Sequence, residues 1–458
     1  MKNNILRIIS VFSLVIFCFP TSAQNVEKNP STDLEHMLKL LGITYPNLPP
    51  KAEDPNRPSF IFPTRADNPE GGWKDSLRNT YLRSDFGLWN NYDESKTGNY
   101  SPIDLLKMIN GKEIKNADQW WLKRRPELFT DVQREVWGTI PNKKFLPEVK
   151  FESSTKIVGD GDTAYIQKNI RGIIDVSGYP DVEDIPKIVA TLRFPSNDST
   201  PMPVLIVINS NGEIPYYQQK YCFDNGWAIC AFNAIALQPD NQKSLTSFLI
   251  GLCNHGKFRK PEDWGALAAW SWGVSKLIDY FEKDKDIDET KVGVSGVSRF
   301  GKAALVTMAY EQRVYTAHVS CSGALGAKLS RRNYGETLEN VVGSKLYHWC
   351  AGNLLKWVGN LEKMPVDAHS LIALCAPRRV FITGGTNDSW TDPYGMYLAC
   401  KYANQAYELL GYKGIIMDDN VPEKDVAYIS GNIGYLLHDG GHSDVYDWPS
   451  FFEFINRE

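Results

Sequence analysis

Two serines that could act as nucleophiles lie in the segment VGVSGVSRFGKAAL, residues 292–305, where an apolar run changes into helix-forming residues. A serine at a strand-to-helix turn can attack a carbonyl carbon, as in the G-x-S-x-G turn of hydrolases. Gly296 precedes Ser298 by two positions, but Gly301 follows it by three, so this general pattern is broken. Ser298 is therefore either a nucleophile or a helix cap. Ser295 lies earlier in the run and is the weaker candidate.

A serine nucleophile needs a histidine base, and the base needs an acid that orients it. In hydrolases built from alternating strands and helices the chain order is serine, acid, histidine. The histidines that follow Ser298 are His348, His369, His438 and His442. We predict His442 as the base, because it follows the last apolar run and a pair of glycines that let the loop bend. His438 is interpreted as structural, and His369 as the start of a helix.

The acid is expected after the penultimate apolar run, in GGTNDSWTDP, which contains Asp388 and Asp392. Asp392 precedes a proline, as a helix N-cap does, so Asp388 is the preferred acid. Activity should fall as the pH is lowered and His442 becomes protonated. No group of histidine, cysteine and carboxylate residues has the spacing of metal ligands, so no metal or cofactor is expected.

The elements that must position these residues are short runs rich in valine, isoleucine and phenylalanine. They are KIVATLRFP from residue 187, PVLIVIN from 203, GWAICAF from 226, KVGVSG from 291, AHVSCSG from 317, RRVFITGG from 378 and IGYLLHDG from 433. Apolar residues at helical spacing fill 264–283 and 392–411, and also 116–142 further upstream. Strands that alternate with helices predict an α/β fold, a three-layer αβα sandwich with a mostly parallel central sheet. Chemistry in such sheets lies beyond the carboxyl ends of the strands.

The N-terminus predicts export. Residues 1–23 contain two basic residues, an apolar run and a small-residue exit, as in a secretory signal peptide; a short membrane anchor is the alternative. Residues 24–110, rich in proline, asparagine and aspartate, are interpreted as an extension that wraps the catalytic domain of residues 111–458. The net charge of −4 gives no indication of nucleic-acid binding, and no later stretch is apolar enough to span a membrane. We expect a monomer in the periplasm or outside the cell.

The segment GVSRFGK, residues 296–302, resembles the nucleophile pattern G-C-S-R-x-G-K of carbohydrate esterase family 15, the glucuronoyl esterases, with Val297 in place of the cysteine. Further similarity to the bacterial type of this family lies in WWLKRRPEL, CSGALGAKLSRRNYGET, LIALCAPRRVFITGGTNDSWTDP and GGHSDVYDW. Together these motifs cover about residues 115–450.

The resemblance implies an α/β-hydrolase fold and a secreted serine esterase without a cofactor. Its substrates would be esters of (4-O-methyl-)glucuronic acid on glucuronoxylan, including links to lignin, cleaved through an acyl-enzyme on Ser298. By position, Arg299 would stabilise the oxyanion. Lys302, Glu336 and Trp390 would hold the sugar. Without the resemblance, these residues would be interpreted as a solvated arginine and lysine, a helix-capping glutamate and a core tryptophan.

Two positions depart from the family pattern. Fungal members place the acid as a glutamate where this chain has Cys321, which favours Asp388 as the acid here. In an oxidising compartment the vacated position suggests the hypothesis that Cys321 forms a disulfide with Cys350. Leu325 stands where the family often has glycine, and would alter the pocket. The alternative functions are an acetyl xylan esterase or another carbohydrate esterase on the same fold, and a non-catalytic polysaccharide-binding relative.

Overall fold

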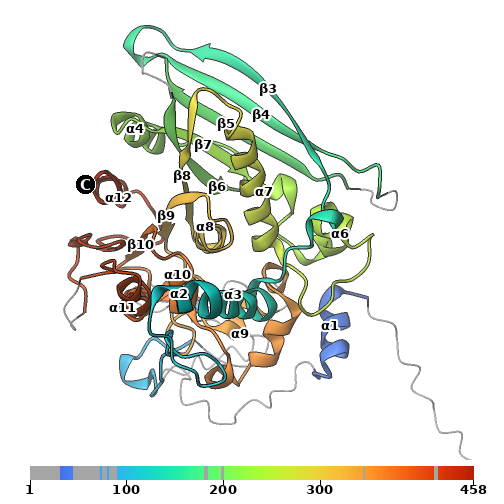
Figure 1. Cartoon of the computed structure of the whole chain (residues 1–458), viewed down its shortest axis with the longest axis vertical. Helices are drawn as coiled ribbons and strands as arrows, with labels where there is room; N and C mark the ends of the chain where they lie inside the picture. The colour runs from blue at the N-terminus through green and yellow to red at the C-terminus, as the bar shows by residue number, and fades with distance from the viewer. Residues whose placement is uncertain are drawn as a thin grey trace, which may run out of the picture.

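The computed structural model describes residues 31–44, 73–74, 80–81, 90–179, 184–196, 201–343, 346–416 and 421–457. The predicted signal peptide lies outside these residues. A ten-stranded sheet runs through the centre of the molecule, in the order β11-β12-β10-β9-β8-β6-β7-β5-β4-β3 (Figure 1). A separate two-stranded antiparallel pair is formed by β1 (Trp73–Lys74) and β2 (Thr80–Tyr81).

Neighbouring parallel strands form the middle of the sheet. They are β6 (Met202–Asn209), β7 (Ala228–Asn233), β8 (Ile287–Val297), β9 (Val314–Ser320), β10 (Arg379–Gly385) and β12 (Ile433–His438). Apart from residues 288–291 in the first half of β8, most of their side chains are buried, since helices cover both faces, which explains the apolar runs in the sequence. Each of these strands was predicted.

The remaining strands pair in the antiparallel direction. They are β3 (Val149–Val158), β4 (Tyr165–Ile174), β5 (Lys187–Pro195) and β11 (Ala427–Tyr428). β3 and β4, which form a long ribbon at one edge of the sheet, were not predicted from the sequence (Figure 1). Most side chains of β3 are exposed, so this strand has no apolar run.

Helices cover the two faces of the sheet. One face carries α4 (Tyr216–Asp224) and α12 (Trp448–Asn456), which pack on an aromatic cluster around Trp227 and Phe381. The other face carries α7 (Ala266–Phe281), α8 (Arg299–Tyr310), α10 (Ala368–Ala373) and α11 (Pro393–Leu409) over the larger core. The predicted three-layer α/β architecture is confirmed.

Shorter elements surround these layers. They are α1 (Asp33–Leu41), α5 (Ala234–Leu237), α6 (Phe248–Cys253) and α9 (Leu338–Val341), with single turns at Glu94–Lys96, Lys143–Phe145, Gly161–Thr163, Gln242–Thr246, Tyr347–Trp349, Gly352–Trp357, Leu361–Lys363 and Ser389–Thr391. The helix expected over 116–142 runs from α2 (Ala117–Gln119) through a π-helical turn, Trp120–Arg124, and α3 (Arg125–Val132) to a second such turn, Gln133–Trp137.

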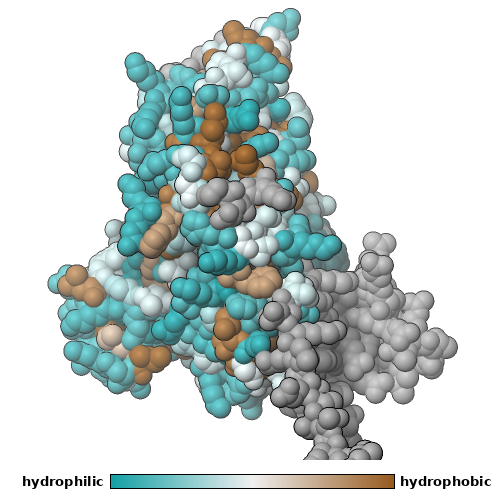
Figure 2. Space-filling view, turned by 90° about the vertical axis from the view of Figure 1, so that its right-hand side faces the viewer, coloured by the Kyte–Doolittle hydropathy of each residue, from teal (hydrophilic) through white to brown (hydrophobic). Residues whose placement is uncertain are grey.

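The described part of residues 24–110 contacts the main body. On α1, Asp33 forms a buried ion pair of 2.8 Å with Arg259 and accepts a hydrogen bond from Tyr347. One face of the molecule is largely hydrophilic, with apolar side chains in small separate patches (Figure 2). No helix among the described residues has the length and apolar character needed to cross a bilayer.

Candidate active site

Four neighbouring parallel strands end at the same edge of the sheet, and a residue with reactive chemistry follows each of them. Ser298 follows β8, Cys321 follows β9, Asp388 follows β10 and His442 follows β12. The strand order β12-β10-β9-β8 therefore brings together residues that lie as much as 144 positions apart in the chain. Such an edge is where ligands bind in open α/β sheets.

Ser298 occupies a sharp turn between β8 and α8, with the backbone angles φ 61° and ψ −126°. A Cβ on Gly296 would lie 2.3 Å from the carbonyl oxygen of Phe300, and one on Gly301 would lie 2.7 Å from that of Ser320. Both positions therefore require glycine, because a neighbouring stretch of backbone lies too close for any side chain. The turn is a nucleophile-type elbow whose second glycine packs against β9, which explains its unusual spacing.

His442 and Asp388 are joined by a hydrogen bond of 2.7 Å between Nδ1 and Oδ2. Thr391 also donates to Oδ2, at 2.8 Å, and only 5% of the Asp388 side chain is exposed, against 41% of His442. With Nδ1 donating to this carboxylate, Nε2 can accept a proton. No hydrogen bond connects Ser298 with His442 in the described residues; such contacts are often long in free enzymes and shorten with substrate. Asp392 instead caps α11 and pairs with Arg332 at 2.9 Å.

The rival serine, Ser295, has a histidine and an aspartate of its own. Its Oγ lies 3.0 Å from Nδ1 of His318, and Nε2 of His318 lies 3.0 Å from Oδ2 of Asp447. Thr383 donates to the same carboxylate at 2.6 Å. The side chains of this series are at most 1% exposed, so no substrate can reach Ser295. The series is a buried structural network. His438, also buried, is the last residue of β12, as expected.

Arg299, the first residue of α8, forms an ion pair with Asp240. The carboxylate of Asp240 also accepts hydrogen bonds from Nε2 of His348 at 2.7 Å and Nε1 of Trp349 at 2.6 Å. Burial tends to raise the pKa of Asp240, but these hydrogen bonds and the charge of Arg299 outweigh it and hold the pKa well below its usual range. The guanidinium also lies 5.0 Å from the centre of the Trp349 ring.

Neither Asp240 nor Trp349 was predicted from the sequence, in which His348 is only one of several histidines that follow Ser298. Asp240 stands in an ordinary Pro-Asp-Asn turn, and nothing in its spacing relates it to Arg299. Asp240 and Trp349 fix the position of the guanidinium of Arg299, the residue that follows Ser298 in the chain. Arg299 is thus neither fully solvated nor free, although 39% of its side chain remains exposed.

Lys302 and Glu336 form a buried ion pair of 2.9 Å, with 3% and 4% of their side chains exposed. Glu336 also accepts a hydrogen bond from the amide of Ala324 at 3.0 Å, and its own amide donates to the carbonyl oxygen of Trp390 at 2.6 Å. Nζ of Lys302 lies 5.6 Å from the centre of the Trp349 ring. The ion pair and the hydrogen bond from the Glu336 amide therefore link the three residues that were predicted to hold the sugar. Trp390 is half-buried and lies two positions after Asp388.

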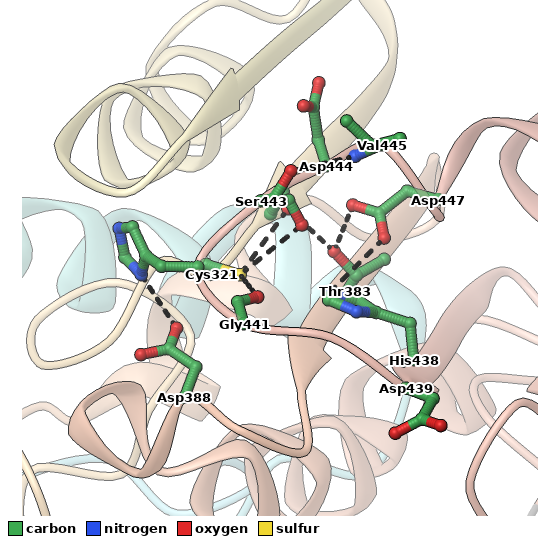
Figure 3. A network of polar contacts seen from close by, with 12 residues as sticks. Cys321, Thr383, Asp388, His438, Asp439, Gly441, Ser443, Asp444, Val445 and Asp447 are labelled. Carbon is green, nitrogen blue, oxygen red and sulfur yellow. Dashed lines mark hydrogen bonds and ion pairs between the residues drawn. The ribbon is translucent and has the colours of Figure 1, made fainter. Parts of the chain in front are cut away.

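The predicted disulfide between Cys321 and Cys350 is wrong, because both are free thiols. The sulfur of Cys321 points at the loop that contains His442, 4.0 Å from the carbonyl oxygens of Gly441 and Ser443 (Figure 3). Leu325 is buried in a left-handed conformation, φ 61°, which a glycine would adopt more easily.

The chain is similar to known proteins both in sequence and in structure. The sequence model of a family described as glucuronyl esterase, fungi, matches residues 182–411. The carbohydrate esterase MZ0003, of an unknown prokaryotic organism, is 30% identical over 408 residues, which cover 80% of this chain and 91% of that protein. The 4-O-methyl-glucuronoyl methylesterase of Hypocrea jecorina is 28% identical over 67% of this chain and 62% of its own length.

Solved structures give the same relationship. A CE15 glucuronoyl esterase from Teredinibacter turnerae superimposes with a TM-score of 0.77 and 30% identity, covering 93% of this chain and 98% of that one. A promiscuous CE15 esterase from a marine bacterial metagenome follows with a TM-score of 0.71 and 29% identity, covering 80% and 99% of the two chains.

Proposed function

Because the chain belongs to carbohydrate esterase family 15, the glucuronoyl esterases, we propose that it hydrolyses esters of (4-O-methyl-)glucuronic acid on glucuronoxylan, including those that link this sugar to lignin. The chain is a carboxylic ester hydrolase. The observation that carries the mechanism is the 2.7 Å bond between His442 and Asp388, at the sheet edge where Ser298 occupies its sharp turn.

Acylation begins when Oγ of Ser298 attacks the carbonyl carbon of the ester and its proton passes to Nε2 of His442. Asp388 keeps Nδ1 protonated and stabilises the imidazolium that forms. His442 then returns the proton to the leaving alcohol as the carbon–oxygen bond breaks. A water molecule, deprotonated by the same histidine, hydrolyses the acyl-enzyme to the uronic acid and regenerates the serine.

The oxyanion that develops on the carbonyl oxygen needs donors that are already in place. The backbone N–H of Arg299 lies at the start of α8, where helix N–H groups have no partner within the helix. The guanidinium, held by Asp240, supplies charge-assisted donors from the side.

The sugar is held by Lys302, Glu336 and Trp390. The buried ion pair offers both N–H donors and carboxylate acceptors to hydroxyl groups, and its members are kept in position by each other. The half-buried indole of Trp390 offers an apolar face to the pyranose ring. A small acetyl group would use none of these contacts. We propose, further, that residues 1–23 are a signal peptide and that the mature enzyme acts as a monomer in the periplasm or outside the cell.

The experiment compares wild type with Ser298→Ala on benzyl glucuronate and on nitrophenyl acetate. Ser298→Ala should lower kcat on the glucuronate ester at least about 10⁴-fold, because the substitution removes the hydroxyl that we propose forms the acyl-enzyme. The matched control is Ser295→Ala, which should retain most of its activity, since that serine is closed off from substrate.

Substantial activity of Ser298→Ala would remove Ser298 from its role. A preference of the wild type for the acetyl ester would favour the other carbohydrate esterases. Asp388→Asn tests the acid: kcat should fall strongly with little change in KM, whereas an unchanged kcat would show that the base is oriented by another group.

A further inference from the structure

Three side chains of different chemistry converge beside the nucleophile turn: Cys321, Asp388 and His442. The sulfur, a carboxylate oxygen and an imidazole nitrogen all lie within 4.8 Å of one another. Among the residues that the structure describes, no other group of three or more histidine, cysteine and acidic side chains comes this close together. Only Asp388 and His442 have a part in the proposed hydrolysis, so the thiol has no task there.

We propose that Cys321, Asp388 and His442 form a binding site for a divalent cation of the zinc class, and that its occupation inhibits the esterase. The binding is a property of the three side chains alone. Inhibition rests on the proposed function, because the cation would occupy the base and the acid of the hydrolysis.

The distances suit such an ion after a small adjustment. Zinc binds sulfur at about 2.3 Å and histidine nitrogen or carboxylate oxygen at about 2.0–2.2 Å, so ligands of a tetrahedral site lie roughly 3.3–3.6 Å apart. Side-chain shifts of about 1 Å would contract the present spacing to that range. His442 can make this movement, since 41% of its side chain is exposed and its loop contains Gly440 and Gly441. The hydrogen bonds from Thr391 and His442 both go to Oδ2 of Asp388, which leaves Oδ1 for a cation.

The charges also match. A thiolate and a carboxylate together neutralise a divalent cation, so that a nearly buried site carries no net charge. Burial raises the pKa of the Cys321 thiol well above its usual value, so the thiol is protonated without the cation. Binding therefore releases the thiol proton to water as the sulfur–metal bond forms, and affinity should increase with pH. The fourth position would face the exposed side of His442 and take water.

The ligand types select the cation. A thiolate and an imidazole favour zinc and the softer transition metals, whereas magnesium and calcium prefer oxygen ligands. Magnesium should therefore leave the enzyme unaffected at concentrations where zinc inhibits.

The test measures binding and inhibition separately on the full chain. Cobalt(II), used as the spectroscopic probe, should give thiolate-to-metal charge-transfer absorption with wild type, and this absorption should be absent in Cys321→Ala and Cys321→Ser. Cys253→Ala is the matched control, because Cys253 is a partly exposed free thiol elsewhere in the fold; this variant should keep the absorption. Zinc inhibition is expressed relative to the metal-free rate of each variant, and loss of the sulfur should raise the half-inhibitory concentration at least about 10-fold.

Absence of the charge-transfer band in wild type, or its persistence in both Cys321 variants, would overturn the proposal. A chain without glucuronoyl esterase activity that still shows a Cys321-dependent band would refute the proposed function and leave the metal site standing. Equal zinc inhibition of wild type and Cys321→Ala would show that the thiol contributes nothing to the inhibitory site.

Discussion

Asp240 offers the sharpest test of how the oxyanion is stabilised. It accepts hydrogen bonds from His348 and Trp349 on Oδ1 and pairs with Arg299 through Oδ2. In Asp240→Asn the amide oxygen can serve the two ring N–H groups, but the amide NH₂ then faces the guanidinium, and two donors repel each other. The substitution therefore releases Arg299 while it keeps the shape of the site.

The size of the effect follows from the conformational entropy that the released Arg299 side chain must lose when it binds the oxyanion. A free arginine has about 2 kcal/mol of rotamer entropy, and part of this has to be removed when the guanidinium meets the oxyanion. A cost of about 1.4 kcal/mol corresponds to a 10-fold lower kcat. Complete removal in Arg299→Ala should cost more, about 10²–10³-fold. KM should change little in Asp240→Asn, because the oxyanion exists only in the transition state.

Steady-state kinetics on benzyl glucuronate, in a double-mutant cycle, decides the question. Asp240→Asn should lower kcat in the wild-type background and add almost nothing in the Arg299→Ala background. An equal fall in both backgrounds would refute the reasoning, because Asp240 would then act independently of Arg299.

Three further predictions concern sugar binding, stability and pH. Lys302→Met leaves Glu336 buried without its cation and removes the charged donor that we propose for the sugar, so KM should rise about 10-fold to 100-fold while kcat changes less. Asp33→Asn breaks a pair in which Arg259 is fully buried, and should lower the free energy of unfolding by about 3–5 kcal/mol in urea titrations. Burial lowers the pKa of His348, so the unfolded chain binds more protons once the pH falls below about 6.5 and stability decreases. His348→Gln, which does not titrate but can donate a hydrogen bond, should make Tm less dependent on pH between about 7 and 5.

The stability prediction has a matched control variant, and each of the three predictions has a result that would contradict it. Asp224→Asn breaks an exposed pair with Lys220 and should leave the free energy of unfolding almost unchanged, because solvent screens such a pair. A similar loss in Asp33→Asn would mean that α1 contributes little to the fold. An unchanged KM in Lys302→Met would remove Lys302 from sugar binding, and an unchanged pH profile of Tm in His348→Gln would assign the acid sensitivity to other groups.

The sequence by itself determined the central layers of this protein. Strands covered on both faces have mostly apolar side chains, so β6 to β10 and β12 were visible as runs rich in valine, isoleucine and phenylalanine. Residues that follow such strands reach one edge, which is why Ser298, Asp388 and His442 could be chosen in chain order. The strands β3 and β4 were not visible. β3 is an edge strand whose side chains are mostly exposed, and β4 alternates buried and exposed side chains over its second half, so neither carries a continuous apolar run.

Only the tertiary structure decided between features that look alike in sequence. Ser295 is connected by hydrogen bonds to a histidine and, through it, to an aspartate, yet it is buried, whereas Ser298 is partly exposed at its turn. Burial depends on how whole layers pack and not on the neighbouring residues in the sequence. The partners of Asp240 lie 59 and 108 positions away along the chain, at Arg299 and His348. Likewise, the order of the strands places Cys321 beside Asp388 and His442. Contacts of this kind depend on which elements lie side by side, and a single sequence does not encode that in its local spacing.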